Sequence, residues 1–86
     1  MAYRIEITRA AVRDLKRLPR QAVHRIDRAI LALGDDPRPA GAVKLRGSDI
    51  TWRIRVGDYR VIYEIHDRKI VIVVVRIRHR RDVYDR

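Results

Sequence analysis

The chain has 86 residues, which is enough for one domain with a small core. It contains no cysteine, and its three histidines are not spaced as metal ligands, so the sequence excludes disulfide bonds and structural zinc as sources of stability. The 21 lysines and arginines outnumber the 11 acidic residues and give a net charge of +10. Because most of these cations are arginines, we expect a partner rich in phosphates or carboxylates, either a nucleic acid or an acidic protein.

The N-terminal segment alternates apolar and polar side chains over residues 3–8, which predicts a strand with one buried face. It lacks the hydrophobic stretch of a signal peptide, so we expect neither secretion nor membrane insertion. We therefore place the protein in the cytoplasm.

Two helices are predicted next, joined as a hairpin. Thr8 is suited to cap the first helix, which ends before Pro19, while Pro19 is suited to the first turn of the second helix and Gly34 to its end. The apolar positions follow helical spacings, with Ala11, Val12, Leu15 and Leu18 in the first helix and Val23, Ile26, Ile30 and Leu33 in the second. Residues 35–49 are predicted to be a loop, too short to link a second domain, so we expect one domain over residues 1–86.

A β-hairpin is predicted from two alternating segments, residues 51–56 and 59–66, that meet at Gly57-Asp58. A two-residue loop with glycine first fits a type II′ turn, and its register places Arg55 directly opposite Arg60. Like charges opposite each other destabilise a sheet. This pair therefore lies either on a surface without a function, which tolerates the repulsion, or on a face that binds anions. We favour the anion-binding face because Arg53 lies on the same side.

The last strand is predicted from the apolar run at residues 70–75, which reads as a central strand covered on both faces. A connection of three residues, 67–69, places Arg60 opposite Arg76, with Arg78 and Arg80 continuing along that face. The same register puts Ile62, Ile72 and Val74 on this face, where Val83 or a partner chain could cover them. The expected fold is α+β with β-α-α-β-β-β order, in which the helix hairpin packs on one face of a mainly antiparallel four-stranded sheet.

Several motifs stand in an order that we know from one protein family. They are Pro37-Arg38-Pro39, Lys44-Leu45-Arg46-Gly47, the whole segment 52–65, and His79-Arg80-Arg81-Asp82-Val83-Tyr84. With these motifs the chain resembles, over essentially its whole length, the RelE/ParE superfamily of toxins from type II toxin-antitoxin systems. The resemblance implies the RelE-like microbial RNase fold. RelE-like toxins cleave messenger RNA in the ribosomal A site, whereas ParE-like toxins inhibit DNA gyrase.

The resemblance also suggests which residues form the site. Carried over position by position, the catalytic set of a RelE-like toxin falls on Arg53, Arg55, Arg60, Arg80 and Tyr84. Further basic residues are expected to contact RNA, and these are Lys44, Arg46, Arg76, Arg78 and Arg81. Because ParE-like toxins generally lack the full catalytic set, the resemblance favours a metal-independent endoribonuclease that needs no cofactor.

The chain departs from the family pattern at two places. Arg78 replaces a glycine that many relatives have before the His-Arg pair, which adds a candidate phosphate contact. Arg53 and Arg55 replace lysines, and an arginine stays protonated, so it clamps phosphate but is a poor proton acceptor. His79 is a candidate acid or base, but its parity in the strand favours a packing role, and His66 and Glu64 are weaker candidates.

The resemblance implies partners as well. We expect a cognate antitoxin, acidic in charge, that wraps this protein in a hetero-oligomeric complex, in addition to messenger RNA and the ribosome. Two other functions remain open at this point: gyrase inhibition without catalysis, and a noncatalytic module that binds RNA or the ribosome.

Overall fold

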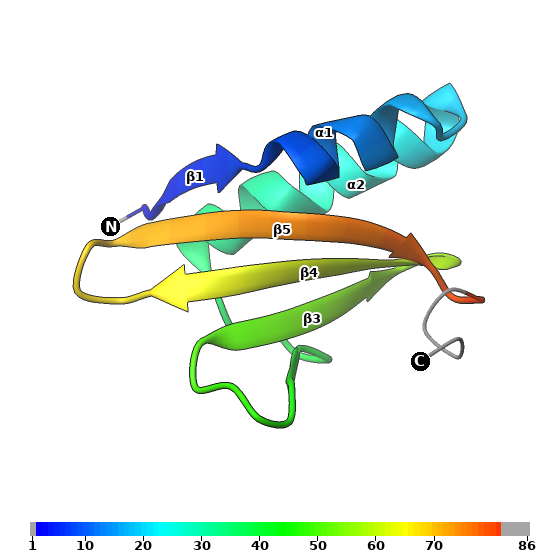
Figure 1. Ribbon diagram of the computed structural model, residues 1–86. Coiled ribbons are helices and arrows are strands. Elements are labelled where there is room, and N and C mark those ends of the chain that lie inside the picture. Colours follow the sequence, from blue (N-terminus) through cyan, green and yellow to red (C-terminus); the bar gives the residue numbers. More distant parts are fainter. Residues whose placement is uncertain (1, 82–86) are drawn as a thin grey trace.

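The structure is a computed structural model that describes residues 2–81, and it is a two-helix hairpin packed on a mixed sheet (Figure 1). Its elements are, in chain order, β1 (Arg4–Ile7), α1 (Arg9–Lys16), α2 (Arg20–Asp35), β2 (Val43–Lys44), β3 (Thr51–Val56), β4 (Tyr59–His66) and β5 (Val71–His79). The strands lie in the order β1-β5-β4-β3-β2, with β1 parallel to β5 and the other neighbours antiparallel. The predicted α+β order is confirmed, but the described sheet has five strands because the short β2 forms in the segment predicted to be a loop.

Helix α1 begins where the sequence predicts, and α2 begins one residue later than predicted, because Pro19 precedes its first turn. The Thr8 hydroxyl accepts the Ala11 N–H at 3.1 Å at the start of α1, and Pro19 is the residue before α2. The prediction that Gly34 ends α2 is wrong, because the helix continues to Asp35. Gly34 instead lies against β1, where its carbonyl accepts the Tyr3 N–H at 2.7 Å. A Cβ at position 34 would lie 3.2 Å from the Tyr3 carbonyl oxygen, so this glycine allows a close approach of helix and strand.

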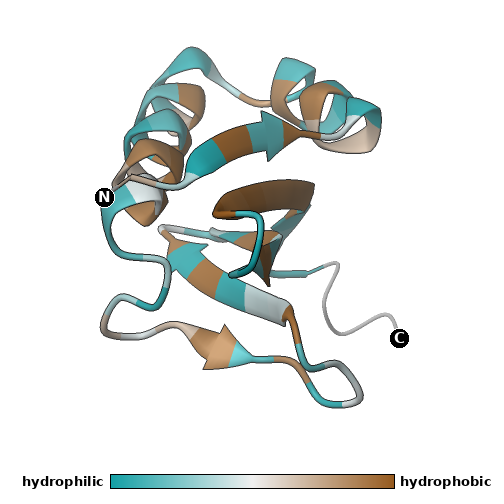
Figure 2. Ribbon diagram, turned by 90° about the vertical axis from the view of Figure 1, so that its left-hand side faces the viewer, coloured by the Kyte–Doolittle hydropathy of each residue, from teal (hydrophilic) through white to brown (hydrophobic). Residues whose placement is uncertain are grey.

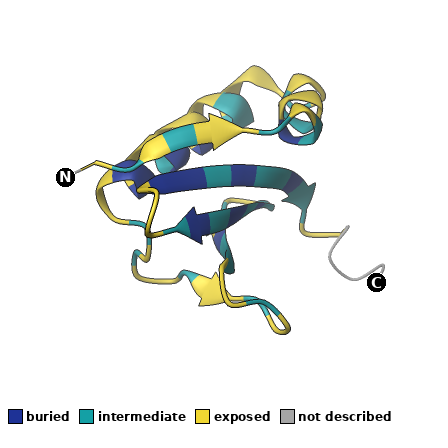
Figure 3. Ribbon diagram, turned by 60° about the vertical axis from the view of Figure 1, so that its left-hand side comes forward, coloured by how far each residue is buried: buried dark blue, intermediate teal, exposed yellow. Residues whose placement is uncertain are grey.

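The core lies between α2 and one face of the sheet, and β5 is the strand that this core covers most fully (Figure 3). Polar and apolar residues alternate in bands along both helices (Figure 2), and the predicted apolar positions Ala11, Ile26, Ile30 and Leu33 are buried. Val12, predicted on the same apolar stripe, is 38% exposed. Tyr63 is fully buried in this core, and its hydroxyl donates a 2.7 Å hydrogen bond to the Pro37 carbonyl. Burial raises the pKa of Tyr63 to about 12, so the side chain serves as a neutral core residue.

Two different elements cover the outer edge of β5. Strand β1 pairs with its first part, from Arg4 opposite Val71 to Ile7 opposite Val74. Beyond that point α1 lies along the strand, and the Thr8 hydroxyl donates to the Val75 carbonyl at 2.7 Å (Figure 1). An uncovered strand edge presents unpaired N–H and C=O groups, so α1 protects the half of β5 that β1 does not reach.

The pairing of β4 with β5 differs from the predicted register in two ways. The turn between them has four residues, 67–70, so His66 pairs with Val71. A bulge then shifts the pairing again between Ile62 and Tyr63. The predicted pair of Arg60 with Arg76 is therefore wrong, because Arg78 stands opposite Arg60.

The longer turn also changes which residues enter the core. Ile72 and Val74 were predicted on the open face, but both are fully buried on the helix side of the sheet. Ile70, predicted as the first strand residue, belongs to the turn, where it has a positive φ of 56° and is 40% exposed. The extra turn residue moves the side chains before the bulge to the other face, because the side-chain period of a strand is two, and the bulge returns Arg76 and Arg78 to the predicted face.

A polar cluster joins three segments at the end of the sheet near this turn. Asp67 accepts hydrogen bonds from the Tyr3 hydroxyl at 2.6 Å and from Arg38 at 2.9 Å. The hydrogen bond from Arg38, followed by the bond from Tyr3, lowers the pKa of the exposed Asp67 carboxyl. The Arg38 guanidinium also lies 5.4 Å from the centre of the Trp52 ring. Within the described chain, neither helix is both long and apolar enough to cross a membrane.

The corrected register predicts a large difference between two neighbouring isoleucines. Ile72→Ala leaves a cavity in the core and should lower the free energy of unfolding by about 2–5 kcal/mol. Ile70→Ala, in the exposed turn, should lower it by less than about 1 kcal/mol. Urea denaturation of the two variants beside the wild type measures both values, and equal losses would contradict the observed register.

Candidate nucleic-acid interface

The face of the sheet opposite the helices carries arginines from three adjacent strands. We call this set the arginine face, and its members are Arg53, Arg55, Arg60, Arg76 and Arg78. Residues that pair across antiparallel strands share a face, so the registers place them in two rows. One row is Arg55, Arg60 and Arg78, and the other is Arg53, Ile62 and Arg76.

The first row brings three positive charges into direct succession across β3, β4 and β5. Arg60 stands opposite both Arg55 and Arg78, and each like-charged pair costs a few tenths to about 1 kcal/mol. In addition, the Nε atom of Arg60 is buried and has no hydrogen-bond partner within residues 2–81. Phosphate groups bound on this face would remove the repulsion and supply acceptors, so the arrangement is suited to a nucleic-acid backbone.

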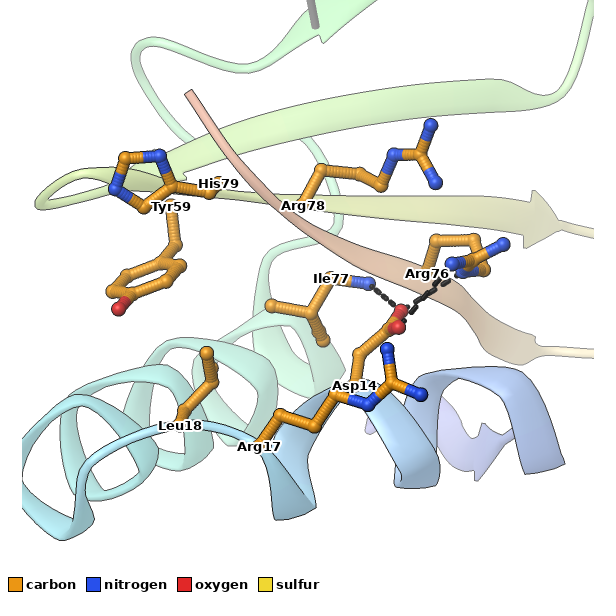
Figure 4. A pocket seen from close by; sticks show the side chains of 8 residues that line it. All are labelled: Asp14, Arg17, Leu18, Tyr59, Arg76, Ile77, Arg78 and His79. Carbon is orange, nitrogen blue, oxygen red and sulfur yellow. Dashed lines mark hydrogen bonds and ion pairs between the residues drawn. The ribbon is translucent and has the colours of Figure 1, made fainter. Parts of the chain in front are cut away.

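Arg76 differs from the rest of the arginine face because a carboxylate of α1 holds its side chain (Figure 4). Its Nε and Nη2 atoms donate to the two Asp14 oxygens at 2.8 and 3.2 Å, and the Ile77 N–H donates to Asp14 at 2.9 Å. The Arg78 side chain extends away from α1 in the same view. Arg76 was predicted to contact RNA, but the structure turns its guanidinium toward the helix.

The Asp14 carboxyl is an ionised group in a largely enclosed position, with only 13% of its side chain exposed. Burial acts to raise its pKa. The hydrogen bonds from Arg76 and Ile77, together with the charges of Arg76 and Arg78, lower the pKa by more than burial raises it. The net pKa of Asp14 is lowered, so the carboxylate stays charged and binds Arg76 at neutral pH.

The tip of the β3–β4 hairpin meets the end of β5. The Arg80 N–H donates to the Asp58 carbonyl at 2.7 Å, and Arg80 Nε lies 3.9 Å from the Asp58 carboxylate. The side chain of Arg80 remains about half exposed, near the row of Arg55, Arg60 and Arg78. Arg81 is exposed beside it. Tyr84, the last predicted catalytic residue, lies outside the described residues, as does Val83.

Two predicted RNA contacts do not join the arginine face. Lys44 pairs with Trp52, so it lies on the helix side of the sheet, 3.9 Å from the Asp49 carboxylate. Arg46 lies in the exposed turn before β3, at the opposite end of that strand from the Gly57-Asp58 tip. Lys44 belongs to the edge strand β2, and Arg46 belongs to the turn that follows it, so neither continues the row of Arg55, Arg60 and Arg78.

His79 and the two weaker acid-base candidates, His66 and Glu64, all contact other side chains. His79 contacts the Tyr59 ring edge-on, with 5.3 Å between the ring centres, which confirms the packing role expected from its parity. His66 Nε2 lies 2.9 Å from a Glu64 oxygen, near the end of β4 that is far from Arg60. Among the described residues no group of three or more His, Asp or Glu side chains could hold a metal ion.

Two hollows flank Tyr59 at the junction of helices and hairpin tip. The first, of about 400 Å³, has Leu18 and Ile77 in its lining and Arg17 and Arg78 beside them (Figure 4). The second, of about 380 Å³, lies between the start of α2 and the hairpin tip, from Pro19 to Gly57. Both combine apolar lining with basic residues, so they are suited to apolar side chains of an acidic partner segment.

Asp14 is the residue of this region that the sequence analysis missed. It is an acidic residue at the helical spacing of the apolar stripe, three positions after Ala11 and four before Leu18. A carboxylate on the buried side of a helix needs a positively charged or N–H hydrogen-bond donor, because an unpaired buried charge is unfavourable. The sequence therefore contained a signal that Asp14 has such a partner.

The fold and its arginine face define a class of protein, the small toxins of RelE-type toxin-antitoxin complexes. The RelE-RelB complex of Pyrococcus horikoshii contains a chain that superposes with a TM-score of 0.83 and 32% sequence identity, covering 93% of this chain and 97% of that one. The RelBE2 toxin-antitoxin complex of Mycobacterium tuberculosis gives a TM-score of 0.81 at 28% identity, covering 92% and 99%.

The sequence comparison gives the family itself. The family model described as "ParE toxin of type II toxin-antitoxin system, parDE" matches residues 5–84, so the chain belongs to this toxin family. Toxin RelG of Mycobacterium tuberculosis is 34% identical over the full length of both chains. The mRNA interferase toxin RelE of Escherichia coli is 27% identical, covering 98% of this chain and 92% of its own. The superfamily that the motifs indicated is thereby confirmed.

The lowered pKa of Asp14 predicts how stability depends on pH. A carboxyl whose pKa is lower in the folded than in the unfolded state stabilises the fold above its unfolded pKa, and this contribution is lost as the pH falls through the folded pKa. At pH 7, Asp14→Asn should therefore cost about 1.5–3 kcal/mol of unfolding free energy. The difference between variant and wild type should shrink as the pH falls below about 5.

Urea denaturation at a series of pH values measures this dependence. Asp27→Asn is the matched control, because it removes an exposed carboxylate from α2. A pH-independent difference between Asp14→Asn and wild type would contradict the assignment.

Proposed function

We propose that this chain is the toxin of a type II toxin-antitoxin system and that it cleaves messenger RNA on the ribosome. The observation that carries the proposal is the row of Arg55, Arg60 and Arg78 across three adjacent strands. Repulsion between the like charges of this row lowers the stability of the fold. A bound polyanion removes the repulsion, and this relief adds to the free energy of binding. A rigid sheet also holds the three guanidinium groups in fixed relative positions, which phosphate recognition requires.

The arginines are suited to one part of the reaction. In metal-independent cleavage, the ribose 2′-hydroxyl attacks the adjacent phosphorus, a new P–O bond forms, and the P–O bond to the 5′-oxygen breaks. The 2′-hydroxyl loses its proton and the leaving 5′-oxygen gains one. Permanently protonated guanidinium groups stabilise the negative charge on the phosphorane but do not accept the proton.

We assign roles on this chemistry. Arg60 and Arg80 bind the scissile phosphate, and Arg53 and Arg55 contact flanking phosphates or the transition state. Tyr84 stacks on a base or orients the nucleophile. The ribosome-bound message supplies the remaining alignment of the reacting groups, so cleavage is expected on the ribosome rather than on free RNA.

A relative supports the choice of reaction. The E. coli protein that is 27% identical is named an mRNA interferase, and the similarity covers 98% of this chain and 92% of that protein. The basic positions of β3 and β4 and the arginine after β5 provide the positive charges that such a reaction uses.

Arg60→Ala tests the proposal. Removing a preorganised donor from the phosphate site should slow single-turnover cleavage of ribosome-bound message by about 100-fold or more. Arg28→Ala is the matched control, because it removes an exposed arginine from α2 on the far side of the sheet and should leave the rate unchanged. Primer extension on a defined message gives the rate and the cleavage position, and cleavage by Arg60→Ala at the wild-type rate would exclude the assignment.

The family model supplies a second candidate function. Its description names ParE, and the sequence analysis left gyrase inhibition open. Supercoiling by purified gyrase in the presence of this chain separates the two functions. Inhibition of supercoiling with intact message would favour the gyrase inhibitor, whereas message that is bound but neither cleaved nor accompanied by gyrase inhibition would favour a noncatalytic RNA-binding module.

We also propose a cognate antitoxin with an acidic segment that wraps this chain. The neighbouring structures of P. horikoshii and M. tuberculosis are toxin-antitoxin complexes, which supports the proposal. The arginine face offers charge for carboxylates, and the two hollows beside Tyr59 offer apolar lining for anchoring side chains. Neutralisation would then combine covering of the charge with added packing.

The acidic segment predicts a strong dependence on salt. A peptide with the acidic segment of the proposed antitoxin should bind about tenfold more weakly when salt is raised from about 50 to about 200 mM. A matched peptide with glutamine in place of glutamate should bind more weakly at low salt and depend less on salt. Isothermal titration measures both, and equal binding of the two peptides would contradict the proposal.

A further inference from the structure

Strand β5 contains one residue more than its partner at the point where its character changes from apolar to cationic. Tyr63 pairs with Val74, while the next residue of β4, Ile62, pairs with Arg76. Val75 is therefore the extra residue of a β-bulge. A bulge of this kind changes which side of the sheet the following side chains face.

A comparison with a hypothetical register that lacks the bulge shows which side chains the extra residue turns to the other face. If the register before the bulge continued, Ile62 would pair with Val75 and Val61 with Arg76. Arg76 would then face the core beside Val61, which is fully buried. Ile77 would lie on the open face and Arg78 on the helix side. The bulge is thus the feature that sends Arg78 to the arginine face and Ile77 to the core.

Helix α1 and its cap residue Thr8 bind all three residues of β5 from Val75 to Ile77. The Thr8 hydroxyl donates to the Val75 carbonyl at 2.7 Å, at the bulge itself. Asp14 then accepts from the Arg76 side chain at 2.8 and 3.2 Å and from the Ile77 main-chain N–H at 2.9 Å. Two polar side chains of the α1 region therefore fix three consecutive residues of β5.

We propose that Asp14 is a positioning residue of the arginine face, which holds the bulged segment of β5 so that Arg78 stays opposite Arg60. This inference rests on the proposed function, because it treats the row of Arg55, Arg60 and Arg78 as the phosphate-binding part of the site. Asp14 binds the outer edge of β5 through Arg76 and the Ile77 N–H, so it acts on the arginine face through the strand and not by contact with RNA.

The contact with the main chain separates this role from that of an ordinary ion pair. A carboxylate that only neutralised Arg76 would need no bond to the Ile77 N–H, which fixes the backbone between Arg76 and Arg78. Asp14 is also largely enclosed, with 13% of its side chain exposed, so water competes weakly for both contacts.

The first test measures the register of the backbone and does not depend on RNA cleavage. In nuclear Overhauser spectra, the backbone contact between Arg60 and Arg78 should weaken in Asp14→Ala, while the contact between Ile65 and Ile72 upstream of the bulge should persist. Asp14→Asn should retain most of the first contact, because its amide oxygen still accepts the Ile77 N–H. Asp27→Ala, which removes an exposed carboxylate of α2, should leave both contacts intact. An unchanged contact between Arg60 and Arg78 in Asp14→Ala would overturn the proposal.

The second test couples Asp14 to the bulge in a double-mutant cycle. Deletion of Val75 removes the extra residue and keeps the observed pairings of Ile62 with Arg76 and Arg60 with Arg78. Asp14→Ala should slow single-turnover cleavage by about 10- to 100-fold in the wild-type background, because misplacing a binding group by about 1 Å has effects of this size. In the Val75 deletion it should slow cleavage by less than about threefold, because no bulge remains to be held.

The outcomes of the two tests are distinct. Equal effects of Asp14→Ala in the two backgrounds would indicate a contribution to stability alone and would overturn the positioning role. If the deletion variant does not fold, the backbone contact in Asp14→Ala decides the question. If the wild type leaves ribosome-bound message intact, the proposed function fails, and the same backbone contact still decides whether Asp14 holds the register.

Discussion

The structure depends on one constraint, the alternation of side chains along β5. This strand pairs with both β1 and β4, so its first half must be apolar, while its second half presents cations on the open face. Ile72, Val74 and Ile77 all face the core, and this spacing fits a period of two only if one residue between Val74 and Ile77 is bulged out. The bulge therefore lets a single strand serve as both the centre of the core and part of the arginine face.

Helix α1 covers the core and also the outer edge of β5 beyond Val74, where no strand within residues 2–81 pairs with that edge. Strand β1 ends at Ile7, and an uncovered edge beyond it would expose unpaired main-chain groups. Thr8 connects the two arrangements, since its hydroxyl accepts from Ala11 to cap the helix and donates to Val75 on the strand. Asp14 completes the cover by accepting the Ile77 N–H. The helix and the strand edge are thus joined by polar contacts as well as by packing.

The distribution of charge follows from the same arrangement. The net charge of +10 is unfavourable for a compact chain, and the sheet concentrates part of it in a row of three arginines. Asp14 neutralises Arg76 at the edge of that face, and within residues 2–81 no carboxylate forms an ion pair with Arg55, Arg60 or Arg78. A toxin of a type II system gains from this imbalance, because the same uncompensated charge that is suited to bind a nucleic acid also attracts an acidic neutralising partner. Under the proposed function, the stability of the fold, its target and its partner all depend on this one surface.

The sequence by itself determined the elements whose signals are local. Alternation and helical spacing predicted every strand except β2, and they predicted the helix hairpin. The Gly57-Asp58 turn predicted the pairing of Arg55 with Arg60, because a two-residue turn fixes its own register. The tertiary structure alone decided the pairing of β5, the contact of Gly34 with β1, and the partners of Asp14. A run of β-branched residues looks the same from either face, so turn length and bulge position, which set its register, depend on packing against distant segments. The sequence predicted the arginines of the candidate site. Only the folded sheet determined that Arg78, and not Arg76, stands opposite Arg60.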